Sequence, residues 1–180
     1  MGSPYYSLRA IVRALLATGP PSTSSAFCAV ARQRFSSQRS MPPASSLFKL
    51  SSHPKNLSKF PIPTPALFEH LSRARSLFGA GMGIEAIELL TCVVRATSGM
   101  QWSPEGRMAD ALCIVDADIA QCIQACKEQQ AGGGMKDIQG ARAALDDIRE
   151  AMSDCQSEVE SWGGEFPFER GMANAECLTL

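Results

Sequence analysis

The stretch from Met135 to Trp162 has the most regular apolar pattern in the chain. Apolar or small residues recur there at alternating steps of three and four, which is the spacing of one face of a long α-helix. These positions are Ile138, Ala141, Leu145, Ile148, Met152, Cys155, Val159 and Trp162. Charged residues lie off this seam. Because the seam is narrow, we expect the helix to pack against a partner helix.

A matching seam precedes it. Ser103-Pro104-Glu105 is typical of a helix start, because it combines a cap residue, a first-turn proline and an acid near the positive end of the helix dipole. The predicted helix runs to about Gln130, where Ala131-Gly132-Gly133-Gly134 disfavours its continuation. Its apolar face is Met108, Leu112, Val115, Ile119, Cys122 and Cys126. Two helices of similar length joined by a short glycine turn predict an antiparallel hairpin.

Two shorter helices are predicted before this pair. Thr64-Pro65 suits a helix start, and the helix ends at Gly79 and Gly81. The next helix, from about Met82 to Ala96, is apolar around most of its circumference, so we expect it to lie centrally. The predicted fold class is therefore all-α, with two antiparallel helical hairpins forming a four-helix bundle over residues 64–164.

Charge is divided unevenly along the chain. No acidic residue precedes Glu69, and residues 1–60 hold eight of the 17 basic residues. Residues 61–180 hold the other nine basic residues and all 18 acidic ones, so this part of the chain has a formal charge of −9. Nucleic-acid binding requires a basic surface, so the acidic body argues against that function. No apolar run approaches the ~20 residues of a membrane-spanning helix, and we expect no integral membrane segment.

Residues 1–40 have the composition of a mitochondrial transit peptide, rich in Ser, Ala and Arg and free of acids. Apolar residues from Tyr6 to Leu16 can share one helix face, and Arg34-Phe35-Ser36 resembles a matrix-peptidase cleavage site. We expect a disordered leader and a mitochondrial matrix protein. The alternative is a cytoplasmic protein translated from Met41.

Two further segments flank the predicted bundle. Residues 41–63 are rich in proline and serine and read as a linker with little to bury. Residues 165–180 form a C-terminal tail in which Phe166 and Phe168 surround a proline. We expect this tail to fold back as a cap over the core; the alternative is a short docking segment.

Residues 66–98 resemble a tetratricopeptide-type helical hairpin. Ala74 falls at the small position of the first helix, Gly81 lies at the turn, and Glu85-Ala86-Ile87-Glu88 is similar to the common opening of the second helix. The sequence departs from the repeat at Arg73 and at His70, and Ser98 replaces a closing proline. The resemblance implies binding of a peptide or protein in a groove and supplies no catalytic residue.

The cysteines show no spacing typical of a secreted disulfide framework. Cys122 and Cys126 lie four apart on one helix, but two ligands are too few for a tetrahedral zinc site. A bridge between Cys113 and Cys155 across the predicted hairpin is an alternative. We expect buried free thiols, and neither a metal nor a cofactor.

The candidate chemical groups are Asp116, Asp118 and His70. Asp116 neighbours the predicted seam, and we expect an ion pair with Arg149 of the facing helix. The alternative is a buried general base with a raised pKa. His70 is expected at the rim of the fold rather than as a ligand. The acids Asp146, Asp147, Glu150 and Asp154 are expected on a solvated face that also suits a basic partner.

These observations favour a non-enzymatic helical protein-interaction module: an adaptor, an assembly factor or a small subunit of a mitochondrial complex. The alternative is a small all-α enzyme that uses Asp116 and His70 in a pocket between the two hairpins. A closed core favours the first function, and a cavity of several hundred Å³ with Asp116 pointing into it favours the second. A self-associating coiled coil, and hence a homo-oligomer, is a third possibility.

Overall fold

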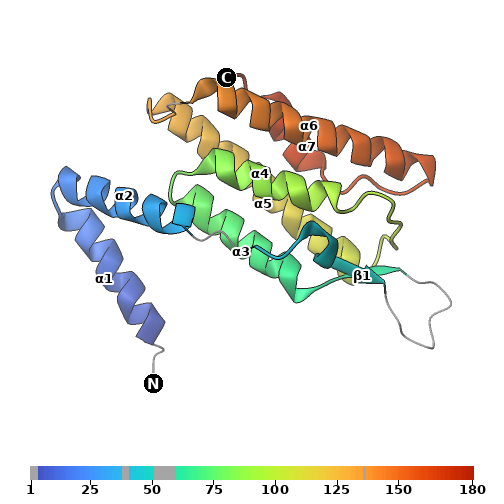
Figure 1. The fold of residues 1–180 in the computed structure, drawn as a ribbon, viewed down its shortest axis with the longest axis horizontal. Coiled ribbons are helices and arrows are strands. Elements are labelled where there is room, and N and C mark those ends of the chain that lie inside the picture. Colours follow the sequence, from blue (N-terminus) through green and yellow to red (C-terminus); the bar gives the residue numbers. More distant parts are fainter. Residues whose placement is uncertain (1–3, 38–40, 51–59, 136) are drawn as a thin grey trace. The chain divides into compact units, whose positions relative to one another are not determined.

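The computed structural model describes residues 4–37, 41–50, 60–135 and 137–180 (Figure 1). The described chain is mostly helical, with one two-stranded sheet. It divides into two compact units, Met1–Arg39 and Ser40–Leu180. No helix in the described ranges is both long and apolar enough to cross a membrane.

The described residues of the first unit form two helices, α1 (Pro4–Thr18) and α2 (Pro21–Ser37). A tight connection joins them: Gly19 N donates to Leu15 O (2.9 Å), and Thr23 N donates to Pro20 O (2.8 Å). The expected disordered leader is therefore helical over these residues. The physical reason is the helical spacing of the apolar residues on α1 and the position of Pro21 in the first turn of α2, where proline fits.

The second unit begins with a short helical turn, η1 (Ala44–Ser46), and two strands. Strand β1 (Phe48–Leu50) pairs antiparallel with β2 (Pro61–Pro63), so that Phe48 lies opposite Pro63. Leu47 and Phe48 are buried. The prediction of a linker with little to bury is therefore wrong at these two positions, where an apolar pair joins the core, and at Pro61 and Pro63, which are buried in β2.

Five helices follow in the described part of the second unit: α3 (Pro65–Gly79), α4 (Gly83–Arg95), α5 (Arg107–Ala131), α6 (Ile138–Ser161) and α7 (Glu169–Glu176). Helix α4 packs on α3, α5 and α6 (Figure 1). Its central place is confirmed, and follows from an apolar surface that needs neighbours on several sides.

Helices α5 and α6 do not pack against each other along their seams. In the described chain, α5 packs on α3, α4 and α7, and α6 packs mainly on α4, with a smaller contact to α7. The expected antiparallel α5–α6 pairing is therefore wrong. Both seams are nevertheless buried, except at Ile138, which is 49% exposed at the first turn of α6, and at Trp162 just after α6, which is half-buried. Each seam requires an apolar neighbour, and both the α5 seam and the α6 seam find one in α4 and α7 instead of in each other.

Two helix starts differ from their predictions. Helix α5 begins at Arg107, because Gly106 has a φ of +126° that interrupts the helix after Ser103-Pro104-Glu105. Helix α3 begins as predicted, but the Thr64 side chain does not cap it. Thr64 Oγ1 instead donates to Ser46 O (2.6 Å), which ties the start of α3 to η1.

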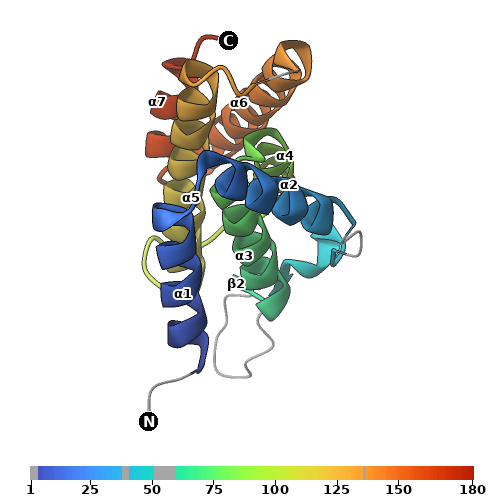
Figure 2. The same cartoon turned by 90° about the vertical axis from the view of Figure 1, so that its left-hand side faces the viewer.

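The C-terminal tail folds back onto the helices. Helix α7 packs chiefly on α5 and also contacts α6, and Figure 2 shows α7 beside α5. Phe168, Ala175 and Leu178 are buried. The tail is thus part of the core, as expected for the cap rather than for a free docking segment. The apolar residues in and around α7 could not remain in water without a cost.

Gly83 offers a test of the packing between α4 and α5. A Cβ on Gly83 would overlap Cys126 Sγ, whereas a Cβ on Gly79 would meet nothing within 4 Å. We expect Gly83→Ala to lower the free energy of unfolding by about 1 to 2 kcal/mol through overpacking. Gly79→Ala is expected to leave it unchanged or raise it by up to about 1 kcal/mol. Denaturant unfolding of both variants measures the difference; equal effects would contradict the close α4–α5 approach.

Candidate functional site

Asp116 is buried where α5 meets the start of α7. Its Oδ2 accepts from Arg170 Nε (2.9 Å), and its Oδ1 accepts from Gly171 N (2.7 Å). The carboxylate is 7% exposed, whereas the Arg170 side chain is 66% exposed. Both carboxylate oxygens are therefore engaged in holding α7 on α5.

The expected partner of Asp116, Arg149, has another role. Arg149 donates to Ala175 O (2.5 Å) and Leu178 O (2.7 Å) at the end of α7, and its Nη1 pairs with Asp146 (2.9 Å). The predicted Asp116–Arg149 pair is wrong, because it assumed that α5 and α6 face each other. Asp116 and Arg149 instead bind the two ends of α7.

Asp118 also has a structural role, because its carboxylate forms an ion pair between two helices. Its carboxylate accepts from Arg75 Nε on α3 at 2.8 and 3.0 Å. The Asp118 side chain is 4% exposed and that of Arg75 is 50% exposed. The pair joins α3 to α5. The apolar pattern does not set the register between these two helices, so it did not identify Arg75 as the partner.

His70 is buried in α3, so its expected position at the rim is wrong. It is 3% exposed, and its Nδ1 donates to Ala66 O one turn earlier (3.1 Å). That local bond satisfies one ring nitrogen without a partner on another helix. His70 does not line the pocket that contains Asp116, so the structure does not bring these two residues into a shared site.

The Asp116 pocket has a volume of about 360 Å³ and lies between α5 and the segment before α7. Trp102, Cys113 and Phe166 line it together with Asp116 and Arg170. Trp102 also contacts Trp162 edge-on, with ring centroids 5.4 Å apart. The volume of this pocket matches the several hundred Å³ that the enzyme hypothesis requires. However, Asp116 already accepts two hydrogen bonds here and no histidine lines the pocket. The other carboxylates that line it, Glu165 and Glu169, are exposed.

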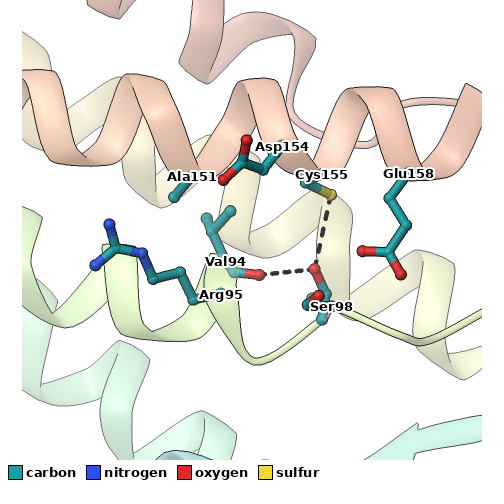
Figure 3. Close-up of a pocket in the computed structure, with 8 residues that line it drawn as sticks. Val94, Arg95, Ser98, Ala151, Asp154, Cys155 and Glu158 are labelled. Carbon is teal, nitrogen blue, oxygen red and sulfur yellow. Dashed lines mark hydrogen bonds between the residues drawn. The ribbon is translucent and has the colours of Figure 1, made fainter.

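A second pocket, of about 210 Å³, lies between the end of α4 and α6 (Figure 3). Val94, Ala151 and Cys155 give it an apolar floor. Thr97 Oγ1 donates to Val94 O (2.7 Å) and lies 3.6 Å from Cys155 Sγ. Burial raises the pKa of the Cys155 thiol. This thiol therefore stays protonated at neutral pH and is a poor nucleophile.

The rim of this second pocket is charged and mainly acidic. Asp154 and Glu158 line it from α6, four residues apart. Arg95 from α4 also lines it, but pairs with Asp147 (2.6 Å) and Glu150 (3.7 Å). The Arg95 charge is thus offset by α6. The acidic groups of the rim are Asp154 and Glu158, and Glu158 Oε1 also accepts from Gly99 N (2.5 Å). We call this feature, with its floor and rim, the α4–α6 pocket.

The cysteines of the described chain are free. Cys113 is exposed in the Asp116 pocket and Cys155 is buried in the α4–α6 pocket, so the alternative Cys113–Cys155 bridge does not form. Cys122 and Cys126 are buried in α5, and Cys122 Sγ donates to Gly83 O (3.4 Å). Within the described residues, no three His, Cys, Asp or Glu side chains gather as a metal site would require.

No protein family, curated protein or solved structure matches the chain. The functional inference therefore depends on the residues of the two pockets. Sequence reasoning identified Asp116 but missed the α4–α6 pocket, because its floor combines residues that are 57 to 61 positions apart, between Val94 and Cys155. The acidic run on α6 was the one sequence signal that pointed toward it.

Proposed function

We propose that Ser40–Leu180 is a non-enzymatic helical protein-interaction module that binds a partner at the α4–α6 pocket. Its role is that of an adaptor, an assembly factor or a small subunit of a larger complex. The observation that carries the proposal is an apolar floor beneath the Asp154 and Glu158 carboxylates. Such a surface suits a protein segment with an apolar side chain flanked by Lys or Arg.

The use of the buried ionisable groups supports this function over catalysis. Asp116 and Asp118 are each bonded to an arginine on another helix, and His70 is bonded to its own helix. General acid–base catalysis requires a group within hydrogen-bond reach of the substrate. The alternative enzyme keeps the 360 Å³ pocket beside Asp116, but the Asp116 carboxylate there is bonded to Arg170 and Gly171 and the other lining acids, Glu165 and Glu169, are exposed.

Two sequence features add to the proposal. The resemblance of residues 66–98 to a tetratricopeptide-type hairpin implies binding of peptides or proteins in a groove. The acid-free composition of residues 1–40 supports import into the mitochondrial matrix. We therefore propose that the partner is a mitochondrial protein. A second copy of the chain is the alternative partner, and mass in solution would identify it.

A charge reversal at the pocket rim tests this function. Tagged full-length protein is captured from purified mitochondria, and co-purifying proteins are quantified by mass spectrometry. We expect Asp154→Lys to reduce recovery of the specific partner about tenfold, because the new charge repels a basic segment. Glu128→Lys is the matched control, since Glu128 is exposed on α5 and does not line the pocket.

Three results would contradict the proposal. One is equal recovery of every protein by the wild type, Asp154→Lys and Glu128→Lys. Another is a partner whose recovery depends on Glu128 alone. Recovery of the protein from cytosol alone would overturn the mitochondrial assignment.

A further inference from the structure

The Met1–Arg39 unit exposes apolar side chains on both of its helices. Ile11 and Leu15 on α1 are 63% and 51% exposed, and Phe27 and Val30 on α2 are 43% and 65% exposed. Four large apolar side chains in so small a unit are more than isolated surface residues would explain. They indicate a surface that becomes covered.

The apolar residues of α1 lie on one side of the helix. Ile11 and Leu15 are four apart, so their side chains share a face. Arg13 is also exposed, but it is two residues from each of them and so points to the opposite side. Helix α1 therefore has an apolar side and a cationic side, which is the arrangement of helices that lie in a membrane interface.

The charge of this unit has one sign. Residues 1–39 contain five arginines and no Asp or Glu. The unit is therefore complementary to an anionic surface, and each arginine near such a surface adds to the attraction. No described helix is suited to spanning a bilayer, so the fitting mode is attachment to the surface.

We propose that the Met1–Arg39 unit binds the surface of an anionic lipid bilayer. Ile11 and Leu15 enter the boundary between headgroups and acyl chains, while Arg13 lies among the lipid phosphates. A nucleic-acid backbone offers the same anionic charge but gives no gain for exposed Ile11 and Leu15, so the apolar side favours lipid. The proposal concerns the uncleaved chain and is independent of the α4–α6 pocket.

Vesicle co-sedimentation of the full-length protein tests this. The vesicles contain either phosphatidylcholine alone or equal parts phosphatidylcholine and phosphatidylglycerol. We expect binding to the anionic vesicles only, weakened by salt. Arg13→Gln should lower the partition coefficient about fivefold, and Leu15→Ser about tenfold. Leu50→Ser is the matched control, because Leu50 is 64% exposed in the other unit and its replacement should change nothing.

Other results overturn the proposal. Absence of binding to both vesicles does so, as does equal binding to both. Equal losses from Leu15→Ser and Leu50→Ser would show that the α1 face is not the site. Binding to duplex DNA that Leu15→Ser leaves unchanged, without binding to vesicles, would assign the unit to nucleic acid instead.

Discussion

Ile148→Ala is expected to lower the free energy of unfolding by about 3 kcal/mol, whereas Ile138→Ala should change it by less than about 0.5 kcal/mol. The two residues belong to the same seam of α6 and undergo the same substitution. Ile148 is fully buried and Ile138 is 49% exposed. Truncation therefore leaves a cavity only at Ile148. Denaturant unfolding of the full-length variants, followed by far-UV circular dichroism, measures both values.

These two substitutions distinguish the observed packing of α6 from an arrangement in which α6 pairs with another helix along its entire seam. If α6 paired along its entire seam with another helix or a second copy, Ile138 would be buried as well. Equal destabilisation by the two substitutions would then be found, and it would contradict the arrangement around α4.

Asp116→Ala should lower the free energy of unfolding by about 2 to 3 kcal/mol and release α7. The substitution leaves the buried Gly171 N–H without its acceptor and removes a charge-assisted bond from Arg170. The Arg170 contribution is discounted, since that side chain is 66% exposed. Limited proteolysis should therefore show faster cleavage in the segment from Gly163 to Phe168.

Asp110→Ala is the matched control for this prediction. Asp110 is an exposed acid on the same helix, and its loss should leave both stability and cleavage close to wild type. If Asp116→Ala were as stable and as protease-resistant as Asp110→Ala, the carboxylate would not hold α7. Its burial would then require another explanation, including the enzyme hypothesis.

The helices themselves could be predicted because their apolar spacing is local. The seam of α5 from Met108 to Cys126 is buried at each predicted position, and α4 is central because it is apolar nearly all round. A seam shows that a helix needs a neighbour, but it does not say which. For that reason the sequence favoured pairing of α5 with α6, whereas α4 and α7 cover these seams.

The site was less predictable because its pairings are distant in sequence. Asp116 finds Arg170 and Gly171 more than 50 residues away, in a tail that had no strong helical pattern. His70 was expected at the rim rather than as a ligand, but it is buried, and the Ala66 carbonyl of its own helix accepts a hydrogen bond from its ring. In the sequence, only the acidic residues on α6, from Asp146 to Asp154, indicated a binding surface near the α4–α6 pocket.

Photo-cross-linking from Ser98, which lines the α4–α6 pocket, tests the proposed binding function most directly. A photoreactive residue at Ser98 of the full-length protein is activated in purified mitochondria, with the same residue at the exposed Gln121 of α5 as control. We predict one dominant adduct from Ser98, absent from Gln121, whose cross-linked segment has an apolar side chain next to Lys or Arg. Absence of a protein adduct at Ser98, or the same adducts from both positions, would contradict a partner-binding α4–α6 pocket.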